Sequence, residues 1–336
     1  MAFESLVSVL LPFRNNAATL HEALTSVLAE RDISLEVIAV NDGSTDEGPA
    51  IAAEIARRDP RVHIISTPGI GIARALSLAA GQTRSPFLAR MDGDDISLPG
   101  RITRAIELLS SNPSLGLAAC RVEGFPERAV GEGLFRYIAW QNALISAADH
   151  ARELFVESPV CHPSVVMRRS AFEAAGGFHD VPWPEDYDLW LRLDACGFGL
   201  AKVAEVLFRW RHREGRATFA DNRYSLAKFD QVKARYLAPK LRRLARPVVF
   251  WGAGKTGKRI ARALEPHGIR PARFIDIDPQ KVGRTARGVH IEGPDDLRPG
   301  EYTIVGAVGA RGARDLIRAF LLQRGFEEGL SFFFAS

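Results

Sequence analysis

Apolar segments of strand length alternate with segments of helical spacing over the first 90 residues, and this alternation restricts the fold more than any other feature. The strand-like segments are 6–13, 34–42, 61–66 and 85–91, and the helix-like segments are 17–30, 44–59 and 71–81. Such alternation predicts right-handed βαβ crossovers and an α/β fold with a mostly parallel sheet. In such sheets, ligands bind beyond the carboxyl ends of the strands.

The size and composition indicate a globular protein with more than one domain. The chain has 336 residues, of which 46% are hydrophobic, and no apolar run approaches the roughly 20 residues that span a bilayer. The N-terminal stretch "MAFESLVSVLLPF" reads as a first strand and not as a signal peptide. Three widely spaced cysteines do not form a disulfide framework, so we expect a cytoplasmic protein.

Three carboxylates are crowded into the stretch "RMDGDD" directly after the fourth apolar segment. Asp92, Asp94 and Asp95 lie within four residues and repel one another unless a cation is shared. Mn²⁺ and Mg²⁺ prefer hard oxygen ligands, commonly one or two carboxylates together with substrate phosphates. The alternative is a solvated acidic turn in which Asp95 caps a helix.

Three other short stretches carry polar groups that suit the same kind of site. Asp42 ends the second strand-like segment in "VNDGSTDE", where it could equally be a turn residue. Glu185 and Asp186 open a helix in "PEDYDLW", where acids also complement the helix dipole. Arg211 and His212 in "WRHREG" could be an exposed basic strand end.

Together these stretches resemble family 2 glycosyltransferases of the GT-A fold over about the first 216 residues. The matching pieces are "VSVLLPFRNNAATLHEALTSVL", "VNDGSTDE", "ARMDGDDISLPGRI", "HPSVVMRRSAFEAAGGF" and "PEDYDLWLRL". The resemblance implies a GT-A nucleotide-sugar-binding fold, with a UDP- or GDP-sugar as the donor. One departure concerns Arg74, a candidate phosphate contact: many members have Arg-Asn at this point, whereas Arg74 is followed by Ala75.

The resemblance also assigns roles to individual residues. Asp186 would be the catalytic base with Glu185 beside it, and Asp92 and Asp94 would be the D-x-D pair at the ribose, metal and diphosphate. The implied donor-binding residues are Pro12, Asp42, Arg74, Asp92, Asp94, Arg211 and His212. Inverting transfer needs a base for the acceptor hydroxyl and a cation for the departing diphosphate. We expect Arg211 and His212 to close over that diphosphate from a mobile loop.

A second strand–turn–helix pattern begins near residue 246. The stretch "VVFWGAGKTGKRI" contains Gly252, Gly254 and Gly257 as a complete G-x-G-x-x-G, and "ARFIDIDP" places Asp276 near the offset of a ribose-binding acid. Two interpretations remain open. The region could bind a dinucleotide, as an NAD(P)-linked oxidoreductase or sensing module does, or it could be a Rossmann-like module kept for packing. About 90 residues amount to half a dinucleotide fold, and no general acid accompanies the turn.

The predicted organisation is a GT-A domain at 1–216, a basic helical linker at 217–245 interrupted near Pro239, and a small Rossmann-like α/β domain at 246–336. This layout resembles the queuosine-tRNA galactosyltransferases, through "RYIAWQNAL", "PED", "WRH", "WGAGKTGKRIARAL" and "DIDPQK". Residues 202–246 hold thirteen Lys and Arg against four acids, which suits RNA or an anionic membrane surface near a lipid-linked or cell-surface glycan. Donor sugar and oligomeric state stay open.

Overall fold

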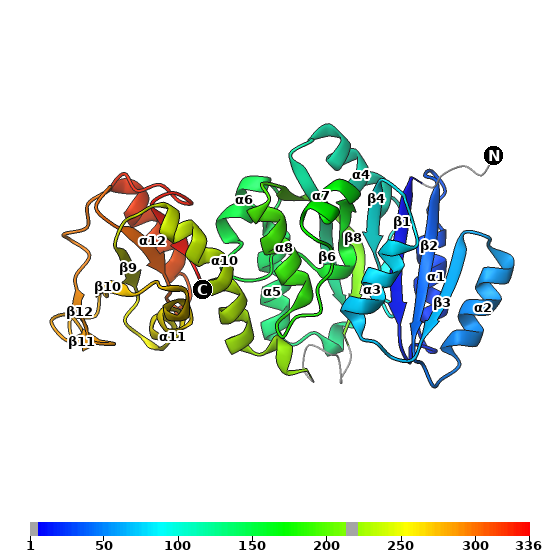
Figure 1. The fold of residues 1–336 in the computed structure, drawn as a ribbon, viewed down its shortest axis with the longest axis horizontal. Helices are drawn as coiled ribbons and strands as arrows, with labels where there is room; N and C mark the ends of the chain where they lie inside the picture. The colour runs from blue at the N-terminus through cyan, green and yellow to red at the C-terminus, as the bar shows by residue number, and fades with distance from the viewer. Residues whose placement is uncertain (1–5, 213–220) are drawn as a thin grey trace. The chain divides into compact units, whose positions relative to one another are not determined.

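A computed structural model describes residues 6–212 and 221–336, which form two compact units (Figure 1). The N-terminal unit comprises residues 1–150, 159–181 and 185–220, and the C-terminal unit comprises 151–158, 182–184 and 221–336. The predicted domain boundary at 216, and Arg213 and Arg216 of the basic region, lie outside the described residues. No helix among the described residues is long and apolar enough to cross a membrane.

One sheet of eight strands organises the N-terminal unit, in the order β3-β2-β1-β4-β7-β6-β8-β5. The strands are β1 Val7–Phe13, β2 Leu35–Asp42, β3 Val62–Thr67, β4 Phe87–Arg90, β5 Ile96–Ser97, β6 Leu115–Phe125, β7 Val166–Arg168 and β8 Gly199–Arg211. The first four pair in parallel, as do β6 and β8, whereas β7 and β5 pair antiparallel with their neighbours. The predicted α/β fold with a mostly parallel sheet is confirmed.

Helices pack on this sheet through the apolar side chains that recur at helical spacing in the sequence. They are α1 Leu20–Leu28, α2 Gly48–Arg58, α3 Ile72–Gly81, α4 Arg101–Ser111, α5 Glu132–Ala143, α6 Ala147–Glu153, α7 Arg169–Ala174 and α8 Glu185–Ala195. All seven residues of β1 are buried, as expected for a central strand covered on both faces. Leu24 of α1, Ile55 of α2 and Ile102 of α4 share one core cluster with Val9 of β1.

The C-terminal unit contains a second, smaller sheet in the order β11-β12-β10-β9-β13-β14. Its strands are β9 Val248–Trp251, β10 Pro271–Ile275, β11 Thr285–Ala286, β12 Val289–Glu292, β13 Thr303–Gly306 and β14 Phe332–Phe334. All pairings except the β11–β12 hairpin are parallel. The helices are α10 Leu226–Arg243, α11 Lys255–Leu264 and α12 Ala313–Gln323.

Helix α10 differs from the expected linker in two respects. It runs without a break through Pro239, where the sequence predicts an interruption, because its packing on α11 offsets the backbone hydrogen bond that the proline removes. Its apolar face packs on α11, and Lys233 is buried with its Nζ directed at the carbonyl oxygen of Val156. Not every cation of the basic region is therefore at the surface.

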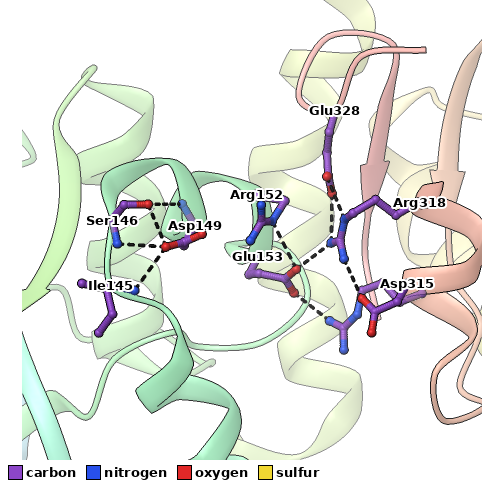
Figure 2. Close-up of polar contacts among 9 residues, drawn as sticks. Ile145, Ser146, Asp149, Arg152, Glu153, Asp315, Arg318 and Glu328 are labelled. Atoms are coloured by element: carbon purple, nitrogen blue, oxygen red, sulfur yellow. Dashed lines mark hydrogen bonds and ion pairs between the residues drawn. The ribbon is translucent and has the colours of Figure 1, made fainter. Parts of the chain in front are cut away.

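A buried carboxylate ties residues 151–158 to the rest of the C-terminal unit (Figure 2). Glu153, the last residue of α6, accepts bonds from Arg314 at 2.9 Å and from Arg318 at 2.6 Å, and Arg318 also bonds Glu328 at 2.8 Å. Because Glu153 is 5% exposed, loss of these arginine partners would leave its charge buried and uncompensated, which is strongly destabilising.

Candidate active site

The acid cluster lies at the carboxyl end of β4, which pairs with β1 beside β2 near the middle of the sheet (Figure 1). One carboxylate oxygen from each of Asp92, Asp94 and Asp95 lies within 4.8 Å of the others. Asp94 and Asp95 are buried and Asp92 is partly exposed. Hard oxygen donors this close together fit a divalent cation such as Mn²⁺ or Mg²⁺, whose charge would offset their repulsion.

A buried arginine connects this cluster with the second pair of acids. Arg90, the last residue of β4, is 1% exposed and its guanidinium is paired with the Asp92 carboxylate. Burial alone would lower the pKa of Arg90, but the charges of Asp92, Asp95 and Glu185 raise it above its usual value. The guanidinium therefore stays charged and lies among acids from two distant parts of the chain.

Glu185 and Asp186 open helix α8, where the sequence pattern predicts a helix start near Pro184. Glu185 is buried, and Asp186 is partly exposed with its carboxylate accepting a bond from the Tyr187 backbone N–H at 2.7 Å. Desolvation and then the charge of Glu185 raise the pKa of Asp186 to about 7, although Arg90 acts in the opposite direction. A carboxyl group with this pKa suits a general base near neutral pH.

His162 is a neighbour of Glu185 that sequence reasoning did not single out. Its Nδ1 lies 4.0 Å from a Glu185 oxygen, and its ring is enclosed by Phe178 and Trp190. Burial, followed by the charge of Arg90, holds the pKa of His162 well below its usual value. The imidazole is therefore neutral, and Glu185 does not gain a cationic partner from it.

Asp42 ends β2, and its carboxylate organises the loop that follows β3. It accepts bonds from the Thr67 hydroxyl and the Ile70 N–H, both at 2.6 Å, and from the Gly71 N–H at 2.9 Å. Burial would raise the pKa of Asp42, but these bonds outweigh that effect and lower it. Asp42 is thus ionised and holds the segment that leads into α3.

Pro12 and Arg74, the other donor-side candidates at this end of the unit, differ in burial. Pro12 is buried in β1 opposite Val40, beyond the last residue that pairs with β4, so its missing N–H costs no ladder bond. Arg74 on α3 is 64% exposed and pairs with Asp180 at 2.9 Å. An exposed pair of this kind restrains the side chain weakly.

Arg211 and His212 lie at the end of β8. The Arg211 N–H donates to Asp95 Oδ1 at 2.7 Å, its Nε donates to the Asp94 carbonyl at 2.5 Å, and its Nη2 pairs with Glu22. The His212 N–H donates to the Phe125 carbonyl at 2.7 Å, and the ring packs edge-on against Trp210. Arg211 is therefore bound to the acid loop itself.

Asp95 and Arg101 hold the acid loop in place; Asp95 is the third carboxylate of the crowded stretch, and Arg101 was not predicted as a site residue. Asp95 is fully buried and receives the Arg211 N–H, which fixes the end of β8 beside the cluster. Arg101 is fully buried, and its Nη1 lies 3.3 Å from the carbonyls of both Arg90 and Pro163. The available signal for Arg101 was a cation six residues after Asp95, in "DDISLPGR".

Comparison with known proteins identifies the family to which this chain is similar. Residues 8–176, just over half of the chain, match the model described as Glycosyl transferase family 2. An uncharacterized glycosyltransferase of Haemophilus influenzae is 29% identical over 212 residues, covering 61% of this chain and 65% of the relative, slightly under two thirds. The amylovoran biosynthesis glycosyltransferase AmsE of Erwinia amylovora is 29% identical over 209 residues, covering 61% of this chain and 76% of the relative.

Among solved structures, a mannosyltransferase shares the fold. PcManGT from Pyrobaculum calidifontis, determined with GDP-Man and Mn²⁺, superposes with a TM-score of 0.53 over 72% of this chain and 65% of its own, at 19% identity. This likeness confirms the GT-A-type fold expected from the sequence.

Proposed function

The chain belongs to glycosyl transferase family 2, and from that premise we propose that it moves a hexose, with inversion, from a UDP- or GDP-sugar to an acceptor hydroxyl in a metal-dependent reaction. Two observations together carry this proposal. Carboxylate oxygens of Asp92, Asp94 and Asp95 lie within 4.8 Å of one another. The charge of Arg90, which pairs with Asp92, also interacts with Glu185.

On the donor side, Asp92 and Asp94 would hold Mn²⁺ or Mg²⁺, which supplies positive charge to the departing diphosphate. Asp42 would contact the base, with Pro12 and Arg74 completing the donor site. Arg211 and His212 would lie beside the diphosphate, and the bonds of Arg211 to Asp94 and Asp95 support this position.

On the acceptor side, Asp186 would take the proton of the attacking hydroxyl. Its pKa of about 7 makes it a base near neutral pH, and its partial exposure leaves it within reach of a substrate. Glu185 would act on Asp186 by its charge, which raises the basicity of the neighbouring carboxylate. Arg90 would limit that effect, so that a substantial fraction of the carboxylate stays ionised at pH 7.

For the acceptor we propose a queuosine nucleoside in tRNA, which would place the enzyme in the cytoplasm. A family 2 domain at 1–216, a basic connection at 217–245 and a Rossmann-like domain at 246–336 would correspond to the layout of such enzymes. The exposed Arg242, Arg243 and Arg246, together with half-buried Lys240, support a phosphate-binding surface at the end of α10.

A cell-surface or lipid-linked glycan is the second candidate acceptor, favoured by the likeness to AmsE. The two candidates predict different labelled products. The chain is incubated with radiolabelled UDP- and GDP-hexoses and Mn²⁺, and with total tRNA that contains or lacks queuosine. Label in queuosine-containing tRNA alone supports the tRNA acceptor, and label in added lipid-linked glycan alone contradicts it. If none of the donors is hydrolysed or gives a labelled product, the glycosyltransferase proposal itself is contradicted.

A further inference from the structure

The glycine turn of the C-terminal unit contains two glycines that packing requires and one that it does not. A Cβ on Gly252, which has φ +116°, would lie 2.6 Å from the Ala307 carbonyl, and a Cβ on Gly257 would lie 1.8 Å from the Gly252 carbonyl. Gly254 has φ −79°, and a Cβ there would meet nothing within 4 Å. The protein itself therefore gives no steric reason for the glycine at 254, which faces open space.

That open space belongs to a cavity of about 510 Å³ at the carboxyl ends of three parallel strands. Its lining includes Gly252 after β9, Asp276 after β10 and Val308 after β13. β9 lies between β10 and β13 in the sheet. The chain runs from β9 to β10 on one flank of β9 and later forms β13 on its other flank. This is the topological switch point at which open α/β sheets bind ligands, and the volume suits a small molecule.

The walls of the cavity differ in chemistry. Lys255 and Thr256 begin helix α11, whose first turn has no side-chain cap, so positive charge and the helix dipole both favour an anion there. Ile277 and Leu316 also line the cavity, although they are 76% and 75% exposed, and Trp251 packs edge-on against Phe320 at 5.1 Å between centroids. Large apolar side chains left in solvent beside a cavity suit a flat, largely apolar group.

Asp276 supplies a carboxylate between these walls. It accepts bonds at 3.0 Å from the backbone N–H groups of Ala253 and Asp278, and Lys281 Nζ lies 3.1 Å away. Burial would raise the pKa of Asp276, but these partners outweigh it and lower the pKa, so the group is ionised. Its Oδ1, which accepts the Asp278 bond, has a second lone pair that suits a ribose hydroxyl, and as an acceptor-only oxygen it offers no bond to a 2′-phosphate.

We propose that this cavity is a second nucleotide site, separate from the GT-A site, that takes a nucleoside diphosphate unit with a free 2′-hydroxyl. The diphosphate lies at Gly254 and the start of α11, the ribose hydroxyls at Asp276, and the base against the apolar rim. The unit could come from a free nucleotide or from half of a dinucleotide, and no redox step is implied.

The test measures binding of ADP, UDP, NADH and NADPH to the full chain by calorimetry, in EDTA and with Asp94→Asn to weaken the GT-A site. Gly254→Val fills the open space. Gly131→Val is the matched control, because Gly131 is also an uncapped helix N-cap with extended backbone (φ −70°) and no atom within 4 Å of a Cβ. Leu316→Glu, at an exposed rim position, adds negative charge without disturbing the core.

We expect saturable binding of at least one of ADP, UDP and NADH, weakened about tenfold or more by Gly254→Val and by Leu316→Glu but not by Gly131→Val. Preference for NADH over ADP identifies a dinucleotide source, and equal binding identifies a free nucleotide. No saturable binding at millimolar ligand, or binding that neither variant weakens, overturns the proposal. NADPH bound as tightly as NADH overturns the role of Asp276.

Discussion

The guanidinium of Arg90 is paired with the carboxylate of Asp92 at a strand end where Arg90 is almost completely buried. The charge of Arg90 acts on Asp92 and Asp95 after the fourth strand, and also on Glu185 and Asp186, which open α8 about 90 residues further along the chain. The charge of Arg90 thereby opposes the burial and the charge of Glu185, which together raise the pKa of Asp186.

Removal of this cation should therefore destabilise the fold. We predict that Arg90→Met lowers the free energy of unfolding by about 3 to 5 kcal/mol, the usual cost of leaving buried charges unpaired. Urea unfolding measures the change. Arg104→Met is the matched control, since Arg104 is 56% exposed and its pair with Glu107 should contribute under about 1 kcal/mol. Equal stability of the two variants would contradict the role given to Arg90.

Asp94 should control the metal dependence of donor binding. We predict that nucleotide-sugar binding to the wild type weakens when EDTA removes divalent metal, and that Asp94→Asn abolishes turnover and this metal effect while the thermal midpoint stays close to wild type. Calorimetry with and without Mn²⁺ tests this. Asp295→Asn, at an 89% exposed position, is the control. Full activity of the wild type in excess EDTA would rule out the metal assignment.

Asp186 should control the chemical step and not donor binding. We predict that Asp186→Asn lowers kcat by about 10² to 10⁴ and leaves the donor Kd near wild type. In the wild type, kcat should rise as pH increases through about 7, because only the ionised carboxylate accepts a proton. A variant with normal kcat would transfer the role to another group, with Glu185 as the first to test.

The raised pKa of Asp186 also predicts a pH dependence of stability. A carboxyl whose folded pKa is raised to about 7 contributes stability that is fully present when the pH is below its unfolded-state pKa, near 4. This contribution is lost as the pH rises through about 7. An asparagine does not titrate. The thermal midpoint of Asp186→Asn, measured in EDTA, should therefore gain on that of the wild type between about pH 5 and pH 8. If the thermal midpoint of the wild type instead rose relative to that of Asp186→Asn over this pH range, the charged form of Asp186 would be the one that the fold favours.

The basic end of α10 should matter for RNA and not for the donor. If tRNA is the acceptor, neutralising Lys240, Arg242 and Arg243 should weaken tRNA binding and reduce its salt slope by about one unit for each phosphate group that is no longer bound. Filter binding at several salt concentrations measures the slope, and nucleotide-sugar affinity should be unchanged. An unaltered slope would remove α10 from the acceptor surface.

Local sequence pattern was a sound guide to the elements that carry the site. Apolar runs of strand length and helices between them predict the parallel strands β1 to β4, because burial on both faces requires continuous apolar residues. The positions of Asp42 and Asp92 at strand ends follow from the same pattern, since the carboxyl ends of parallel strands meet at one edge. The helix through Pro239 was not predictable, because packing of α10 on α11 offsets the missing hydrogen bond.

What the sequence determines by itself is the class of fold and the chemistry of the acid clusters, because both depend on local spacing and residue type. Only the tertiary structure shows that Arg90 lies among Asp92, Asp95 and Glu185, that Arg211 is bound to Asp94 and Asp95, and that Gly254 faces a cavity. These relationships join residues that are distant in the chain. They depend on which side chains lose their water together, and that is decided by packing in three dimensions.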